Sequence, residues 1–305
     1  MRHAVLGVGG VGGLVGGALA NVGHPITLIV RPGRRDHYPD QLTVESETLG
    51  TFEAPVQVAD RLDGQFDVVW ITVKAMALEA ALHAIPPKGL RGAVVVPLLN
   101  GVDHIKQLRD RYRPERVLPG TIRVEAEQIV PGRVRQLSAF VDVQVAPSPA
   151  TRARAEALCA ELHTAGLTCE VREDEVTMLW SKLCFLAPFA LATTASGGPL
   201  GLVRSDPSWW ARLEGCVNEA CAVGLAEGAK VAPEPILAAF EGLTDGFRSS
   251  MQKDVAAGRP PEIEAIAGPI LRGGGEYGID VSTTRALMER IMALPYRPRV
   301  TYCGS

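Results

Sequence analysis

The stretch His3–Gly13, HAVLGVGGVGG, decides the fold of the first half of this 305-residue chain. Its first four residues have the pattern of a short buried strand, and Gly7, Gly9 and Gly12 follow with the spacing G-x-G-x-x-G. The small apolar residues of Leu14–His24 predict a helix directly afterwards. A strand, a glycine turn and a helix in this order predict the first unit of a doubly wound α/β sheet.

The glycines of this turn have separate physical roles. Gly7 allows the sharp turn out of the strand, Gly9 lets backbone N–H groups approach a pyrophosphate, and Gly12 lets the helix pack closely on the sheet. The first N–H groups of the helix and its dipole favour a bound anion. We therefore expect a dinucleotide site formed by Gly7, Gly9, Gly10, Val11 and Gly12.

Strands and helices continue to alternate through the first half of the chain. Nearly continuous apolar runs predict strands over Pro25–Val30, Phe66–Val73 and Gly92–Leu99. Such runs are typical of parallel strands that helices cover on both faces. A helix is expected over Ala75–Ile85, and the segment Arg133–Ala146 is expected to add antiparallel strands.

From about Asp174 the pattern changes to helices. A helix over Pro149–Gly166 and a short strand over Leu167–Arg172 precede this point, and few strand signals follow it. The length also favours two domains. We expect a Rossmann-type nucleotide-binding α/β domain over residues 1–172 and an all-helical domain over residues 173–305.

The net charge and the distribution of apolar residues argue against some classes of binding partner. A net charge of -3 argues against nucleic acid, which usually selects a basic surface. We expect no apolar run that spans a bilayer, and so no membrane partner, and the N-terminus has no charged-then-apolar signal pattern. We therefore expect a cytoplasmic protein whose partner is a small molecule. A homodimer is compatible with the sequence, which does not determine the oligomeric state.

The cysteines and histidines indicate neither a metal nor a redox motif. No two cysteines have the C-x-x-C spacing, and the six histidines are dispersed. Scattered reduced thiols are expected, as in most cytosolic proteins. The cysteines are Cys159, Cys169, Cys184, Cys216, Cys221 and Cys303.

Arginines occupy the position that selects between NAD and NADP. An acidic residue at the end of the second strand would bind the ribose 2′-hydroxyl of NAD, but this chain has Arg31 there, followed by Arg34 and Arg35. A carboxylate would repel a 2′-phosphate, whereas guanidinium groups bind it with charge-assisted hydrogen bonds. NADP(H) is therefore the expected cofactor, against the alternative that these arginines form an ordinary solvated loop.

Four further motifs resemble those of ketopantoate reductase (2-dehydropantoate 2-reductase). The segment VKA contains Lys74, LLNG contains Asn100, and LWSKL contains Lys182. The segment SSMQKDVAAGRPPEIE then places Ser250 and Glu262 at a fixed spacing and is the most specific of the four. The resemblance covers essentially the whole chain, in order.

The resemblance implies a role for each matched residue. Lys182 would be the general acid that protonates the ketone oxygen, and Glu262 would orient the substrate and interact with its hydroxyl. Ser250 would bind the substrate carboxylate, and Asn100 would lie near the nicotinamide and the reacting carbonyl. Lys74 would lie beside the cofactor phosphates.

The resemblance also implies pyrophosphate contacts from the glycine turn and a 2′-phosphate contact from Arg31. General chemistry agrees, because ketone reduction needs a proton donor, and desolvation can tune a lysine toward neutral pH for that task. The cofactor would supply the hydride. We expect the active site between the domains, with Asn100 from the first and Lys182, Ser250 and Glu262 from the second.

The chain departs from the family at two positions after the lysine. The family has asparagines four and eight residues further on, whereas this chain has Leu186 and Ala190. A site without those amides is expected to prefer a less polar 2-oxo acid than ketopantoate. Two alternatives stay open: an NADP enzyme of another class on this scaffold, of the β-hydroxyacid dehydrogenase or imine reductase type, and a non-catalytic NADP(H)-binding protein.

Overall fold

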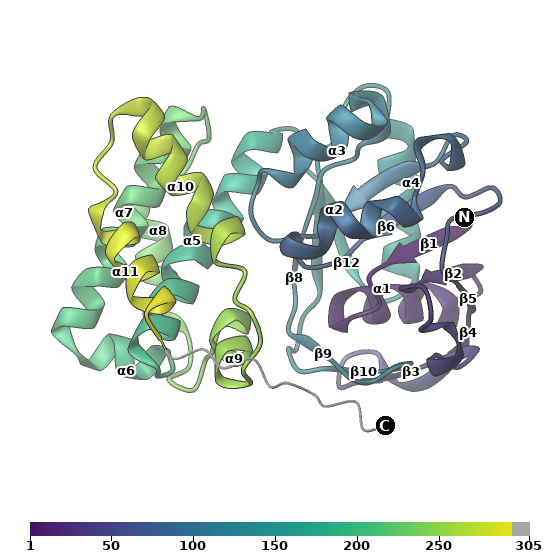
Figure 1. Ribbon diagram of the computed structural model, residues 1–305, viewed down its shortest axis with the longest axis horizontal. Coiled ribbons are helices and arrows are strands. Elements are labelled where there is room, and N and C mark those ends of the chain that lie inside the picture. The colour runs from purple at the N-terminus through teal and green to yellow at the C-terminus, as the bar shows by residue number, and fades with distance from the viewer. Residues whose placement is uncertain (295–305) are drawn as a thin grey trace. The chain divides into compact units, whose positions relative to one another are not determined.

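The computed structural model describes residues 1–294, and the chain divides into two compact units (Figure 1). The first unit is Met1–Glu175, and the second begins at Val176. The sequence placed this boundary near residue 172. Every strand that the structure describes belongs to the first unit, and from Val176 to residue 294 the described elements are helices. Cys303, one of the cysteines expected to be reduced, lies outside the described residues.

A five-stranded parallel sheet forms the centre of the first unit. Its strands have the order β5-β2-β1-β6-β7, so the chain moves outward from β1 on one side and then returns to the other side of β1. Every residue of β1, β2, β6 and β7 is buried, which agrees with the apolar runs that predicted these four strands. The bounds are β1 (His3–Leu6), β2 (Ile26–Ile29), β5 (Gln57–Ala59), β6 (Val68–Ile71) and β7 (Val94–Pro97).

Helix α1 (Gly10–Asn21) packs between this sheet and a second sheet of order β4-β3-β10-β9 (Figure 1). Only β10 of this sheet falls in a segment that was expected to add strands, and no pattern in the sequence predicted β3, β4 or β9. The predicted bounds of the helix were also wrong, because it starts at Gly10 rather than Leu14 and ends at Asn21 rather than His24. The strands are β3 (Gln41–Ser46), β4 (Gly50–Pro55), β9 (Ala126–Val130) and β10 (Arg133–Gln136).

The second sheet explains the glycines inside α1. A Cβ on Gly13 would lie 2.3 Å from Val134 Cγ2, and a Cβ on Gly17 would lie 2.5 Å from Val44 Cγ2. Glycine inside a helix costs about 0.5–1 kcal/mol relative to alanine. Here the missing side chains allow β-branched residues of the second sheet to reach the helix backbone, so the glycines are required by packing.

A third sheet, of order β12-β11-β8, completes the first unit. Strand β11 pairs antiparallel with β8 and parallel with β12, while β10 pairs antiparallel with β9 and parallel with β3. The antiparallel pairing expected of the segment Arg133–Ala146 is therefore confirmed on one side of each strand only. The bounds are β8 (Gly120–Arg123), β11 (Asp142–Val145), β12 (Thr168–Val171) and α4 (Arg152–Thr164).

Cys159 and Cys169 form a disulfide, so the expectation that all the cysteines are reduced was wrong. Cys159 lies in α4 and Cys169 in β12, with Cα atoms 5.0 Å apart, inside the range that a disulfide spans. The helix packs directly against this strand, which brings together two cysteines whose spacing in the sequence matches no motif. Cys184, Cys216 and Cys221 are free and buried.

The connections around the parallel sheet are shorter and more broken than expected. The helix predicted over Ala75–Ile85 is instead a series of short turns around α2 (Leu78–Ala81). Those turns are η2 (Ala75–Ala77) and η3 (Leu82–Ala84). The remaining connecting elements are η1 (Arg35–His37), η4 (Pro87–Gly89), α3 (His104–Tyr112) and η5 (Pro114–Arg116).

The helices of the second unit begin with α5 (Glu175–Ser196). This helix is long and apolar enough to cross a membrane by length and composition, contrary to the expectation that no such segment exists. However, 67% of its most apolar window is buried inside the protein, as in the core helix of a soluble domain. The others are α6 (Leu200–Ser205), α7 (Pro207–Ala226), α8 (Pro233–Gly242), α9 (Ser250–Ala256), α10 (Ile263–Tyr277) and α11 (Ser282–Met292).

Candidate active site

The glycine turn leaves an open approach to the N-terminus of α1. Gly7 has φ +98°, and a Cβ there would lie 2.6 Å from the backbone nitrogen of Val73, so glycine is required at this point. Gly9 precedes the first residue of the helix, and a Cβ there would meet nothing within 4 Å. The first N–H groups of a helix have no acceptor within it. The turn therefore fits an anionic group such as a pyrophosphate.

This turn is held in place by three side chains, none of which belongs to a motif recognised in the sequence. Thr72, just after β6, donates from Oγ1 to the carbonyl of Gly7 at 2.6 Å. Gln128 in β9 donates from Nε2 to the carbonyl of Val8 at 2.6 Å, and the hydroxyl of Tyr38 donates to the same carbonyl at 3.4 Å. Only pairing between distant segments brings these groups together, so no local sequence signal could have identified them.

The remaining expected cofactor residues follow the carboxyl ends of neighbouring parallel strands. Arg31 comes shortly after β2, Lys74 after β6, and Asn100 after β7. Because these strands run parallel to β1, the three residues lie at the same edge of the sheet as the glycine turn. Arg31 is exposed, and Asn100 is half-buried. This edge of a doubly wound sheet is where ligands bind.

The other two arginines of the expected 2′-phosphate contact lie in the same loop. Arg34 donates its backbone N–H to the carbonyl of Arg31 at 3.0 Å, which closes a turn, and its side chain is exposed. Arg35 borders a hollow of about 650 Å³ beside the edge strand β5, together with Asp36 and Asp40. Arg35 thus has carboxylates as neighbours in this hollow, while Arg31 lies two residues after the end of β2.

In the second unit, α5 positions Lys182 in a desolvated setting. The side chain is half-buried, and burial lowers the pKa of Lys182 to about 8, although attraction from Glu262 acts in the opposite direction. Glu262 occupies the N-cap position of α10, makes no capping hydrogen bond with its side chain, and is half-buried. A lysine tuned in this way can exchange a proton near neutral pH, and its carboxylate neighbour acts on its charged form.

The other expected substrate residues have differing surroundings. Ser250 begins α9 and is exposed, whereas the preceding Ser249 is buried and caps this helix by accepting from the N–H of Gln252 at 3.1 Å. Leu186 is half-buried, but Ala190 is fully buried. An asparagine at position 190 would therefore have to enter the helical core, which is a packing reason for the small residue.

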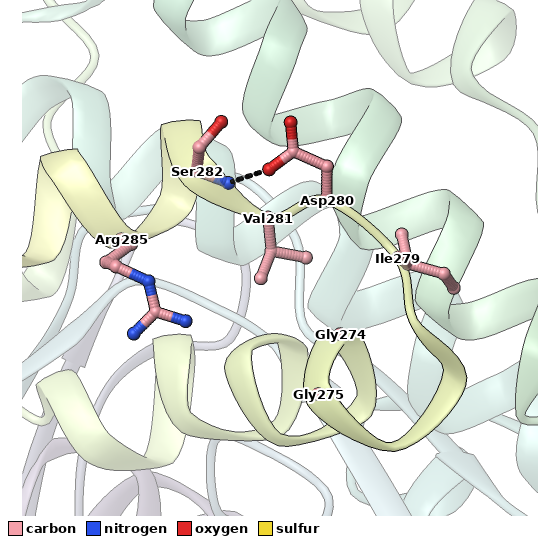
Figure 2. A pocket seen from close by; sticks show the side chains of 7 residues that line it. All are labelled: Gly274, Gly275, Ile279, Asp280, Val281, Ser282 and Arg285. Carbon is pink, nitrogen blue, oxygen red and sulfur yellow. Dashed lines mark hydrogen bonds between the residues drawn. The ribbon is translucent and has the colours of Figure 1, made fainter.

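A pocket of about 200 Å³ lies elsewhere in the second unit, between the end of α10 and the start of α11 (Figure 2). None of the expected site residues borders it. Asp280 accepts from the N–H of Ser282 at 3.0 Å, as Figure 2 shows. Glu219 accepts from the N–H groups of Thr283 and Thr284, both at 2.7 Å. The helix N-terminus beside this pocket is thus already satisfied by carboxylates.

Among residues 1–294, His3, His24 and Glu161 form a group whose ligand atoms all lie within 4.8 Å of one another. The histidines are dispersed along the sequence, but the fold brings two of them together. Trp70 donates from Nε1 to His3 Nδ1 at 3.2 Å, so the neutral ring carries its proton on Nε2, which faces Glu161 at 3.1 Å. A metal ion on Nε2 would need the other tautomer and would break the Trp70 bond.

Family models of known proteins match both units of this chain. The family model described as "Ketopantoate reductase PanE/ApbA" matches residues 3–149, and "Ketopantoate reductase PanE/ApbA C terminal" matches residues 174–294. The 2-dehydropantoate 2-reductase of Caulobacter vibrioides is 31% identical over 289 residues, which cover 90% of this chain and 93% of that protein.

Solved structures share the fold over nearly the whole chain. The crystal structure of a PanE/ApbA family ketopantoate reductase from Ralstonia eutropha has a TM-score of 0.86 and 26% identity, covering 96% of this chain and 97% of that one. D-mandelate dehydrogenase, solved with NADH and anilino(oxo)acetate, has the same TM-score of 0.86 at 23% identity, covering 96% and 98%. These likenesses confirm the expected α/β fold followed by a helical region.

Proposed function

Because the chain belongs to the ketopantoate reductase family, whose members are oxidoreductases acting on CH–OH groups, we propose that it reduces a 2-oxo acid to the 2-hydroxy acid with NADPH. The substrate is ketopantoate or a related 2-oxo acid. The family supports a nicotinamide cofactor, and Arg31 supports its phosphorylated form. The observation that carries the proposal is the desolvated Lys182 with Glu262 as its charged neighbour, in a chain that matches the family models over both units.

The residues of the first unit fit such a cofactor. The N–H groups at the start of α1 bind the pyrophosphate, and Gly9 leaves the space for its approach. Arg31 binds the 2′-phosphate with charge-assisted hydrogen bonds, and Asn100 positions the ring that carries the hydride. When bound, the nicotinamide supplies the hydride for the carbonyl carbon.

The residues of the second unit supply the proton and orient the substrate. Lys182 Nζ donates a proton to the ketone oxygen as negative charge develops on it, and the neutral amine recovers a proton from solvent. Glu262 attracts the charged form of Lys182 and binds the substrate beside it. Ser250 binds the substrate carboxylate. A chain that bound the cofactor without turning over any ketone would instead support the non-catalytic alternative.

The cofactor part of the proposal is tested by replacing Arg31. We expect kcat/KM for NADPH to exceed that for NADH in the unmodified protein. Arg31→Ala should lower the NADPH value by about tenfold to a hundredfold, because a charge-assisted bond contributes about 1.5–3 kcal/mol. The NADH value should hardly change. Arg91→Ala, in an exposed turn far along the sequence, is the control. Equal values of kcat/KM for NADPH and NADH in the unmodified protein would exclude the NADPH assignment.

The pKa of Lys182 predicts the pH dependence of the reaction. Reduction needs the protonated amine, so kcat/KM should be constant below about pH 8 and fall about tenfold per pH unit above it. Oxidation of the hydroxy acid needs the neutral amine and should rise up to the same pH. Steady-state rates at fixed ionic strength between about pH 6 and 10 measure both profiles.

Glu262→Gln should shift the pH at which reduction begins to slow. The carboxylate raises the pKa of Lys182, so its loss should move the break in the reduction profile to lower pH. Glu264→Gln, which changes an exposed carboxylate paired with Arg272, is the matched control. A break that stays in place in Glu262→Gln would show that another group controls the protonation step.

A further inference from the structure

Four phenylalanines stack together in the second unit, and we call Phe185, Phe189, Phe240 and Phe247 the phenylalanine cluster. The rings of Phe185 and Phe240 are stacked with centroids 4.6 Å apart, and those of Phe189 and Phe247 with centroids 4.8 Å apart. The ring centroid of Phe189 also lies 6.2 Å from the ring centroids of both Phe185 and Phe240. The cluster therefore joins α5, α8 and the segment that precedes α9.

The cluster shares a helix face with the candidate acid. Phe185 and Phe189 lie three and seven residues after Lys182 in α5, and residues at these intervals lie on one face of a helix. Leu186, where the family has an asparagine, lies on the same face. Phe185 and Leu186 are half-buried, whereas Phe189 is buried. The accessible part of this face therefore presents apolar groups next to Lys182.

The cluster also reaches the segment expected to hold the substrate carboxylate. Phe247 is half-buried and comes three residues before Ser250. Ser249 Oγ lies 3.0 Å from Thr193 Oγ1 of α5, which fixes this segment against the helix. The ring of Phe247 is thus held close to α5 by both its stacking on Phe189 and the neighbouring hydroxyl pair.

We propose that Phe185 and Phe247 form the specificity wall of the substrate site and that the preferred substrate is a 2-oxo acid with an aryl side chain. This inference rests on the proposed function, because it assigns the substrate class of the same site. Aromatic rings prefer to meet in stacks with centroids about 4.5–7 Å apart, so an aryl substituent can extend the stack. Leu186 and Ala190 provide no amide for a substrate hydroxyl, so two of the polar partners that favour ketopantoate in the family are missing here.

The test compares four substrates with the unmodified, full-length protein and NADPH. Phenylpyruvate and benzoylformate carry an aryl group, 2-oxobutanoate carries a short alkyl group, and ketopantoate carries a hydroxyl. We expect kcat/KM for the better aryl substrate to exceed that for each of the other two by at least about tenfold, since contacts with a hydrophobic pocket discriminate by about 10–200-fold.

Two variants locate the preference. Phe185→Leu and Phe247→Leu should each lower the aryl-to-alkyl ratio of kcat/KM about tenfold, mainly through KM for the aryl substrate. Phe140→Leu, an exposed phenylalanine of the first unit, should leave the ratio unchanged. If either variant fails to fold, inhibition of the unmodified protein by mandelate and by lactate provides the second measurement, and mandelate should bind more tightly by about tenfold.

The outcomes separate this inference from the proposed function. Efficient turnover of ketopantoate or 2-oxobutanoate with no aryl preference would overturn the aryl assignment and leave the reductase in place. The aryl assignment is likewise overturned if the ratio is unaffected in both variants, or if lactate binds as tightly as mandelate. An absence of turnover with all four substrates would overturn the proposed function and the aryl assignment together.

Discussion

Lys182→Ala should lower kcat for every 2-oxo acid that the protein reduces by about 10²–10⁴-fold, the usual contribution of a positioned general acid. The substitution removes the proton donor while leaving the residues of the first unit that are proposed to bind the cofactor. Affinity for NADPH, measured by fluorescence titration, should therefore stay within about twofold. Folding should also be retained, because removing a partly desolvated ammonium relieves the cost of burying its charge.

Two matched variants make the Lys182 result specific. Lys230→Ala changes an exposed lysine of the same unit and should leave kcat unchanged. Lys182→Arg keeps a positive charge but replaces the donor with a group that stays protonated, so the break near pH 8 should disappear from the residual activity. Turnover of Lys182→Ala at more than about a tenth of the unmodified rate would mean that a different group protonates the ketone.

Gly9→Ala and Gly10→Ala should have opposite effects although the two residues are neighbours. A Cβ on Gly10 would lie 2.1 Å from the carbonyl oxygen of Ala126 in β9, so the second sheet or α1 must move. Overpacking of this kind costs about 1–3 kcal/mol or more, which corresponds to a fall in Tm of several degrees. A Cβ on Gly9 meets nothing within 4 Å, so Gly9→Ala should keep Tm within about 2 °C.

Gly9→Ala is expected to weaken NADPH binding although it hardly changes Tm. The added methyl group projects into the space that the pyrophosphate needs, and the loss of a charge-assisted hydrogen bond should raise Kd for NADPH about tenfold to a hundredfold. Thermal unfolding with and without NADPH measures both quantities on the same samples. A large fall in Tm for Gly9→Ala, or an unchanged Tm for Gly10→Ala, would contradict the packing described for this turn.

The sequence by itself determined the parts of this protein that depend on local patterns. Nearly continuous apolar runs identified β1, β2, β6 and β7, because a parallel strand that is buried on both faces consists mostly of apolar residues, with His3 and Thr27 as the buried polar exceptions. The glycine spacing and the motifs around Lys182 and Glu262 identified the family, since those residue types are constrained by the ligand and the chemistry. The helical character of the second half followed from its periodicity.

The tertiary structure alone decided what depends on distant segments meeting. The second sheet packs on α1, and this contact, rather than the turn alone, requires Gly10, Gly13 and Gly17. The Cys159–Cys169 disulfide forms because α4 lies against β12, a contact that no spacing rule encodes.

The same limit applies to the candidate site. The motif named Lys182, but the pKa of Lys182 depends on the burial that the surrounding fold imposes, which lowers it, and on Glu262, distant in sequence, which acts in the opposite direction. The stacking of Phe185 and Phe189 against Phe240 and Phe247 likewise joins three separate segments of the chain. Local sequence constrains backbone conformation and residue chemistry, whereas desolvation, charge pairing and ring stacking depend on which distant side chains share a volume, and the packed chain sets that volume.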